Sequence, residues 1–413
     1  MAAHSTAEAK VFLHIGEPKT GTTFIQQVMW SNRAELGTHG VVLPGHHPQD
    51  HFRASQDLRE IEKLPTDPAG SWAGEWEILA SQARQAGKTA VISHELFSAA
   101  DAGQAGRAVR SLQPAEVHVV LTVRDLATLL PAEWQETVKH RNTRAWEDWL
   151  ADVIDRESAD ADRRQWWFWR VHDTMAILRL WAEHVPPERI HVITTAPRGS
   201  ASGLLWKRFA SVLGIDPGSA DLSRARPNAS LGMAETEFLR RLNQALPGPG
   251  EVPDWFYMWN VKETVAHRAL AGRAPGARLI LPADRDAWAK EQSETLIAGL
   301  RDSGYDIVGD LDDLRPPQVT EPATSPSDQP AGQMLDAAVQ AAAALVVNQY
   351  QREHPAARPQ EARGRGLAGR IESAVAASPR LKRTVREFSS RYPAVRRLRV
   401  LAWRALERTR GHR

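Results

Sequence analysis

The sequence VFLHIGEPKTGTTFIQQV, at residues 11–28, carries the strongest structural signal in the chain. It begins with a short apolar run, continues through GEPKTGTT at residues 16–23, and ends in a segment whose apolar residues have helical spacing. A glycine-rich turn between a strand and a helix lets backbone amides approach an anion, and the helix N-terminus adds partial positive charge. The pattern therefore predicts a phosphate-binding loop.

The rest of the chain predicts the fold class. Short Val-, Ile- and Leu-rich runs lie at residues 41–44, 90–95, 117–125 and 189–195. They alternate with helical patterns, which is typical of strands buried on both faces of a parallel sheet. Helical patterns dominate the second half, at residues 204–213, 233–246 and 285–300. We therefore expect an α/β protein: a three-layer P-loop fold with a central parallel sheet flanked by helices and a mainly helical second half.

The composition is that of a globular protein with an uneven charge distribution. The 413 residues include no cysteine, which excludes disulfides, thiolate metal sites and cysteine nucleophiles. The N-terminus lacks the pattern of a signal peptide and no apolar stretch is long enough to cross a bilayer, so we expect a cytoplasmic enzyme. Fifteen Lys and Arg and three Glu from residue 363 onward give that segment a charge of +12, whereas the remainder carries −10.

Three regions are expected along the chain. Residues 1–315 form the domain with the phosphate-binding loop, residues 316–332 a linker with five prolines, and residues 333–413 a helical tail that is basic toward its end. We expect this tail either to pack on the body of the protein or to lie on an anionic membrane surface. Because no base-reading motif accompanies its charge, nucleic acid is not an expected partner.

The position of its lysine distinguishes this loop from a nucleotide-binding Walker A loop. Thr22 stands where a Walker loop has lysine, and Lys19 lies three residues earlier, inside the loop. A lysine in that position faces the side from which a bridging oxygen leaves, and it can stabilise the negative charge that develops there. The loop resembles the PKTGTT loop of sulfotransferases, which bind the 5′-phosphosulfate of 3′-phosphoadenosine 5′-phosphosulfate and use no metal. The resemblance implies a donor-binding loop made of Gly16, Pro18, Lys19, Thr20, Gly21, Thr22 and Thr23.

A second motif supports the resemblance. Sulfotransferases hold the 3′-phosphate of the donor with an arginine that ends a strand and a serine eight residues later. Here Arg124 ends the strand, and its planar fork suits a phosphate, but the position eight residues on is Ala132. The motif RPNASL offers Arg226 and Ser230 as replacements for the missing donor. Resemblance to bacterial sulfotransferase-like proteins covers residues 11–317.

A base is also required, because an acceptor hydroxyl or amine loses a proton as it attacks sulfur. The third predicted strand ends in His94 and Glu95. Cytosolic sulfotransferases have a histidine at the corresponding strand end, and the heparan-type enzymes use a glutamate. Neighbours on a strand point to opposite faces, so only one of the two is expected to face the sulfur. We prefer Glu95, with His94 as the second candidate.

Glu17 is an unexpected residue in an anion-binding loop. A carboxylate that points toward the bound anion would oppose its binding. We therefore expect the Glu17 side chain to face solvent.

Together these motifs predict a sulfotransferase with Lys19 and either Glu95 or His94 as catalytic residues. The expected product is adenosine 3′,5′-bisphosphate, no metal is expected, and the acceptor is a small molecule or a glycan that the sequence does not identify. Two alternatives stay open. One is an ATP-dependent P-loop kinase, in which Asp125 would serve the magnesium ion, and the other is a non-catalytic nucleotide-binding protein that keeps only the fold.

Overall fold

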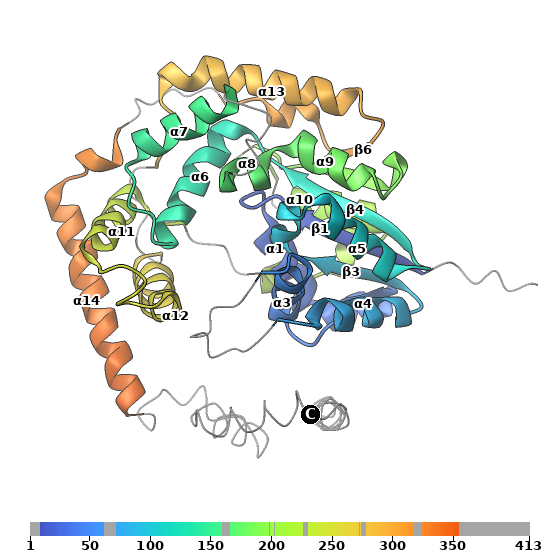
Figure 1. Cartoon of the computed structure of the whole chain (residues 1–413), viewed down its shortest axis with the longest axis horizontal. Coiled ribbons are helices and arrows are strands. Elements are labelled where there is room, and N and C mark those ends of the chain that lie inside the picture. Colours follow the sequence, from blue (N-terminus) through green and yellow to red (C-terminus); the bar gives the residue numbers. More distant parts are fainter. Residues whose placement is uncertain are drawn as a thin grey trace, which may run out of the picture. The chain divides into compact units, whose positions relative to one another are not determined.

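The apolar runs form one parallel sheet (Figure 1). Its strands follow the order β2-β3-β1-β4-β5-β6, and every adjacent pair is parallel. Their bounds are β1 Lys10–Gly16, β2 Val41–Val42, β3 Thr89–Ser93, β4 Glu116–Val123, β5 Ile190–Thr194 and β6 Asp306–Val308. The first five strands were predicted from the sequence, and β6 was not. Because β3, β1 and β4 are parallel neighbours, their carboxyl ends meet at one edge of the sheet, where ligands bind in folds of this class.

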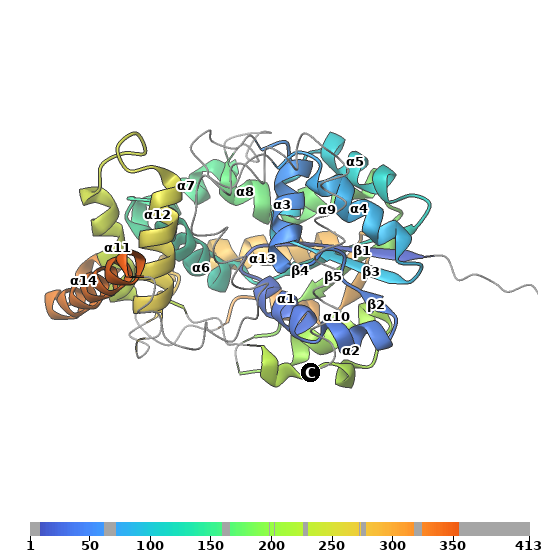
Figure 2. The ribbon, with the colours of Figure 1, turned by 90° about the horizontal axis from the view of Figure 1, so that it is seen from below.

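Helices cover both faces of the sheet, as Figure 2 shows. Along β1, Val11 and Leu13 pack against one layer of helices, whereas Phe12 packs against the other. The first layer contains α3 (Pro48–Leu58), α4 (Glu75–Gln85), α5 (Ala102–Leu112) and α9 (Thr174–Ala182). The second contains α1 (Thr22–Ser31), α2 (Arg33–Thr38) and α10 (Leu204–Leu213). The predicted three-layer α/β fold is confirmed.

A second apolar core lies among helices outside the sheet. It includes the buried Trp134, Trp146 and Trp169. Its helices are α6 (Leu126–Lys139), α7 (Trp146–Ser158), α8 (Trp167–His172), α11 (Met233–Ala245), α12 (Asp254–Tyr257), the π-helix η6 (Met258–Leu270) and α13 (Asp286–Arg301). Helix α6 directly follows β4, so it brings this core to the carboxyl edge of the sheet.

The computed structural model describes residues 9–61, 72–158, 166–197, 199–201, 203–225, 230–271, 273, 278–317 and 324–354. The chain divides into two compact units, residues 1–345 and 346–413. The last described helix, α14 (Ala331–Glu353), begins in the first unit, where Ala337 and Ala341 are buried. Among the described helices, none has the length and apolarity needed to cross a membrane. The boundaries at residues 315 and 332 stay predictions.

Candidate functional site

The loop between β1 and α1 adopts the turn that its glycines predict. Gly16 and Gly21 have φ values of +102° and +91°, a region in which a residue with a Cβ atom is strained. A Cβ on Gly16 would also lie 2.8 Å from the Cα of Glu95. Glycine therefore allows the end of β1 to approach the segment after β3. The loop leads into α1 at Thr22, and the free N–H groups of a helix N-terminus favour an anion.

A cavity of about 940 Å³ opens beside this loop. Most of the residues expected from the sequence line it: Pro18, Lys19, Gly21, Thr22, Thr23, His94, Glu95, Arg124 and Ser230. Gly16 and Thr20 are not part of its wall; the buried Thr20 hydroxyl instead donates to the Glu17 carbonyl over 2.6 Å. Arg226 lies outside the described residues. The structure thus brings three strand ends and the loop to a single cavity.

Two contacts hold Lys19 at the cavity. Its backbone has a positive φ of 61°, and its carbonyl accepts a hydrogen bond of 3.1 Å from Nη1 of Arg124. Its ammonium group is paired with the carboxylate of Glu136, on the last turn of α6. The two residues that the sequence singled out, Lys19 and Arg124, are therefore in direct contact, although 105 residues separate them.

Glu136 is the centre of a cationic cluster. Besides Lys19, the carboxylate contacts Lys139 at 2.5 Å, Lys262 at 3.0 Å and His140 at 3.2 Å. Burial alone would raise the pKa of Glu136, but the hydrogen bond from His140 and the three ammonium groups outweigh it and hold the pKa well below its usual range. One carboxylate thus faces three lysines, so the cluster keeps a net positive charge.

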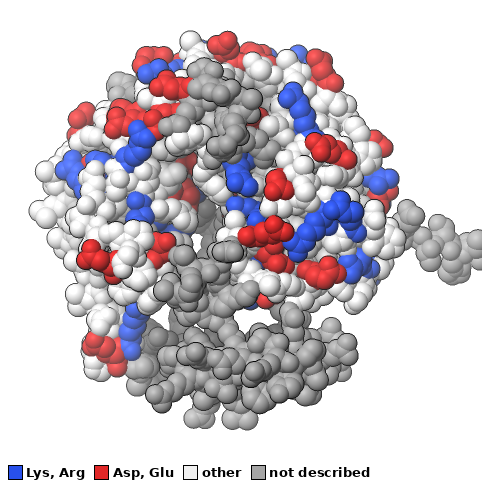
Figure 3. All heavy atoms as spheres, in the orientation of Figure 1, with Lys and Arg blue, Asp and Glu red and all other residues white. Residues whose placement is uncertain are grey.

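The positive charge is concentrated at the cavity. Its wall contains six basic side chains, namely Lys19, Arg59, Arg124, Lys139, Arg141 and Lys262, and three acidic ones, namely Glu95, Glu133 and Glu136. The outer face seen in Figure 3 differs, because there the coloured basic and acidic side chains are intermixed. A concave wall with excess positive charge favours a ligand with several negative charges.

Both candidate bases line the cavity, and which of them faces the sulfur stays a prediction. Strand β3 ends at Ser93, and the turn of 3₁₀-helix that follows begins at Glu95, so strand alternation does not apply. Nδ1 of His94 accepts a hydrogen bond of 3.2 Å from the backbone N–H of Leu96, which places the proton of a neutral ring on Nε2. Glu95 accepts a hydrogen bond of 3.1 Å from Gln26.

The pKa values of this pair shift in the same direction. Burial lowers the pKa of His94. For Glu95, burial acts upward, but the neighbouring His94, hydrogen bonds and the Lys19 ammonium group together lower its pKa. The lowered pKa keeps Glu95 ionised at neutral pH, and the Nδ1 lone pair of His94 is already engaged by the backbone N–H of Leu96. These contacts favour Glu95 over His94 as the candidate base.

The expectation that Glu17 faces solvent is wrong. Its side chain is buried, with 1% of the residue exposed. The carboxylate accepts a hydrogen bond of 2.5 Å from Thr174 and lies 3.4 Å from Nδ1 of His172. Glu17 does not line the cavity, so its charge lies behind the loop and not within it. Sequence spacing could not show this, because its partners are 155 and 157 residues away.

The wall near the expected 3′-phosphate position lacks the usual serine. Ala132 lines the cavity and offers no side-chain donor. Besides the loop threonines, the hydroxyl-bearing residues Thr128, Thr137 and Ser230 line the cavity. Thr128 lies one helical turn before Ala132 on α6, and Ser230 was expected from the RPNASL motif.

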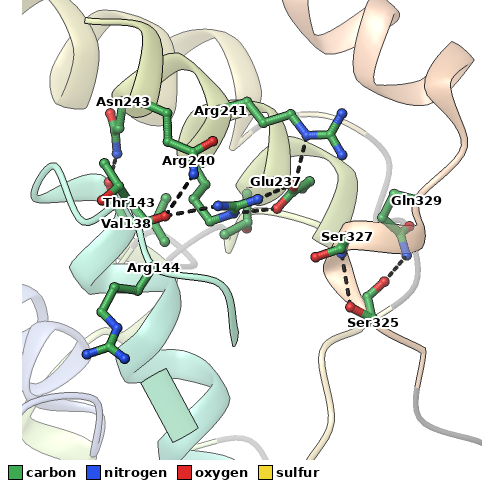
Figure 4. A network of polar contacts seen from close by, with 12 residues as sticks. Val138, Thr143, Arg144, Glu237, Arg240, Arg241, Asn243, Ser325, Ser327 and Gln329 are labelled. Carbon is green, nitrogen blue, oxygen red and sulfur yellow. Dashed lines mark hydrogen bonds and ion pairs between the residues drawn. The ribbon is translucent and has the colours of Figure 1, made fainter. Parts of the chain in front are cut away.

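A polar network fixes the end of α6 that carries the cationic cluster (Figure 4). From α11, Nδ2 of Asn243 donates to the carbonyl of Val138 over 2.8 Å, and Arg240 donates to the carbonyl of Thr143 over 2.9 Å. Arg240 also makes two hydrogen bonds, of 2.7 and 2.8 Å, to the buried Glu237. Lys139, the cavity-wall lysine on α6, is thus carried by a helix end that α11 holds in place.

Sequence reasoning missed Glu136, Lys139 and Lys262. The first two lie four and seven residues after Ala132, a spacing that places all three on one face of a helix. Extending the motif by helical spacing would have found them. Lys262 comes from η6, 126 residues beyond Glu136, and no local pattern indicates it.

A comparison with solved structures finds a similar chain. A sulfotransferase from Alicyclobacillus acidocaldarius is similar at 16% sequence identity and a TM-score of 0.33, over 57% of this chain and 92% of that one. No protein-family model and no curated protein matches the chain. An assignment of function therefore rests on the residues of the site.

Proposed function

We propose that the chain is a sulfotransferase, which moves a sulfuryl group from 3′-phosphoadenosine 5′-phosphosulfate to a hydroxyl or amine without a metal. One observation carries the proposal. Lys19, inside the loop between β1 and α1, shares a single cavity with Arg124 after β4 and Glu95 after β3. These are the three kinds of group that binding and transferring a phosphosulfate require.

The cavity suits such a donor in size and charge. Its volume of about 940 Å³ is within the usual range for sites that bind nucleotide-sized ligands. The loop and the first turn of α1 would hold the 5′-phosphosulfate, and Arg124 would hold the 3′-phosphate by paired charge-assisted hydrogen bonds. The lysines around Glu136 add to the attraction for a polyanion.

The proposed reaction is an in-line displacement at sulfur. A bond forms between the acceptor oxygen or nitrogen and sulfur, while the bond between sulfur and the bridging phosphate oxygen breaks. Glu95 takes the proton that the acceptor loses, and Lys19 stabilises the negative charge that remains on the leaving phosphate oxygen. Rate enhancement would come from positioning and electrostatics.

The acceptor would occupy the part of the cavity that carries aromatic side chains. Phe24, Phe52 and Trp167 contribute aromatic side chains to the wall, beside His94 and Glu95. Aromatic faces bind the apolar faces of sugar rings and of small organic molecules. A small molecule or a glycan with a free hydroxyl or amine fits this description.

The kinase alternative is disfavoured by Asp125. That carboxylate caps α6, because its Oδ1 accepts a hydrogen bond of 2.8 Å from the backbone N–H of Thr128, and the residue is 7% exposed. A helix cap is a structural role that leaves the residue poorly placed for magnesium.

A pair of labelled assays tests the proposal. The full chain is incubated with a mixture of hydroxyl- and amine-bearing acceptors, once with sulfur-labelled phosphosulfate donor and a metal chelator, and once with γ-phosphorus-labelled ATP and magnesium. Transfer of the sulfur label by the wild type, lost in Lys19→Ala and Glu95→Gln, is the expected result. Transfer of the phosphorus label alone would establish the kinase instead.

A further inference from the structure

The carboxylate of Glu17 lies directly behind the anion-binding loop. Its backbone N–H donates to the carbonyl of Thr122 on β4 over 2.9 Å, and its carbonyl accepts from Thr20, so the residue is part of the loop itself. Its side chain is buried, where a charge is poorly screened. Uncompensated, this negative charge would oppose an anion on the other side of the loop.

His172 is placed to supply the compensating charge. The ring is fully buried at the end of α8, and its two nitrogens face two carboxylates. Nδ1 lies 3.4 Å from Oε2 of Glu17, and Nε2 lies 3.6 Å from Oε2 of Glu133. A ring with an acid on each side is stabilised as the doubly protonated imidazolium.

Two further contacts complete the arrangement. The Thr174 hydroxyl donates to the other oxygen of Glu17, and Thr174 is the first residue of the nine-residue helix α9, whose N-terminus also favours a negative charge. Glu133 lines the cavity, and neither its Oε2 nor Nε2 of His172 has a hydrogen-bond partner among the described residues. Because His172 lies between Glu17 and Glu133, the charge behind the loop neighbours an acidic residue of the cavity wall.

We propose that His172 is a positioning residue whose imidazolium neutralises Glu17 and thereby allows the loop to bind a dianionic group. It acts through Glu17 and does not touch the ligand. The inference deepens the proposed function, on which it rests. It also explains how a glutamate can stand in an anion-binding loop, since the acid ties the loop to α8 and α9 while the imidazolium, which also faces Glu133, offsets its charge.

The test is a double-mutant cycle on the full chain. Affinity for adenosine 3′,5′-bisphosphate and the melting temperature without ligand are measured for the wild type, His172→Gln, Glu17→Gln and the double variant. His118→Gln serves as the matched control, because His118 is also buried but contacts Glu116 and His191, away from the loop. Gln keeps hydrogen-bonding capacity and removes the charge.

We expect His172→Gln to weaken bisphosphate binding about tenfold or more, since Glu17 is then uncompensated. The double variant should recover affinity to within about threefold of the wild type, and its melting temperature should exceed that of His172→Gln. The His118→Gln control should bind as the wild type does, whereas Glu17→Gln, which removes a negative charge behind the loop and keeps the imidazolium, should bind more tightly. Unchanged affinity in His172→Gln, or a double variant no better than His172→Gln, would overturn the inference.

The two proposals fail in different ways. If the wild type does not bind the bisphosphate, the proposed function fails, and the melting temperatures decide the inference alone. Recovery of stability in the double variant would then still establish that His172 compensates Glu17. Additive loss of stability would show that the two residues act independently, which contradicts the inference.

Discussion

Glu136 and Glu237 are each surrounded by cations, yet the two clusters are built differently. Glu237 bonds Arg240 and Arg241, its neighbours three and four residues along α11, and its side chain is only 1% exposed. Glu136 pairs with lysines from the loop, from its own helix and from η6, and its side chain is 20% exposed at the cavity. The first cluster is local and closed, whereas the second joins distant segments and opens to a cavity.

The difference indicates which cluster is structural and which binds a ligand. The guanidinium of Arg240 makes two hydrogen bonds to the buried Glu237, so this arginine is committed to its partner. Lysines are mobile point charges, and three of them around one carboxylate leave positive charge to spare. We therefore expect changes at the Glu237 cluster to affect stability, and changes at the Glu136 cluster to affect anion binding.

Lys19→Ala should give the largest effect on function. Removing the charge that stabilises the leaving oxygen should lower the rate of sulfuryl transfer by about 10²- to 10³-fold. Stability should change little, because Glu136 keeps Lys139 and Lys262. Initial rates with the acceptor found by the labelled assay, and urea unfolding, measure the two quantities. Lys10→Ala, at the opposite end of β1, is the control, and an equal loss in both variants would contradict the assignment.

Glu237→Gln should have the opposite profile. Loss of the buried acid leaves Arg240 with an uncompensated charge, and we expect a destabilisation of about 3 kcal/mol. Binding of adenosine 3′,5′-bisphosphate by the folded protein should not change. Chemical denaturation and calorimetric titration report the two properties separately. A binding defect without a loss of stability would remove the distinction between the clusters.

The buried ring of His172, which lies between Glu17 and Glu133, extends the comparison to pH. Burial acts to lower the pKa of His172, but Glu133 and Glu17 outweigh it and raise the pKa to about 9. A raised pKa stabilises the folded state fully below the ordinary value of about 6.5, and this stabilisation is lost as pH rises through 9. We expect unfolding free energy to fall by about 2 kcal/mol from pH 7 to pH 10 through this group. Urea titrations of His172→Gln should lack that part of the decline, and parallel curves for both proteins would contradict the prediction.

Glu136→Gln should give the smallest effect, which is an increase in affinity for adenosine 3′,5′-bisphosphate. Without its counter-ion, the lysine cluster attracts an anion more strongly, so affinity for the bisphosphate should rise about three- to tenfold. The gain in affinity should shrink at high salt, because the side chains of Glu136 and Lys19 are partly exposed to solvent and salt screens their charges. Calorimetry at two ionic strengths measures both, with Glu77→Gln on the exposed face of α4 as the control. Weaker binding in Glu136→Gln would show that the carboxylate itself holds the ligand.

Local sequence patterns predicted most of the fold but only part of the site. The strands, the loop glycines, Lys19 and Arg124 follow from periodicity and short motifs, which depend on neighbouring residues. Glu17 was misplaced because its partners, His172 and Thr174, come from another part of the chain. Buried charges are paired across the fold, and their pairing depends on packing that no local pattern contains.

The central claim is that the cavity binds a phosphosulfate-type nucleotide. Calorimetric titration of the wild type with adenosine 3′,5′-bisphosphate in magnesium-free buffer tests it most directly, with ATP plus magnesium in parallel. We predict binding of the bisphosphate that magnesium does not alter, that Arg124→Ala weakens at least tenfold, and that the control Arg189→Ala leaves unchanged. Binding of ATP with magnesium alone, or equal affinity in Arg124→Ala and the wild type, would contradict the account.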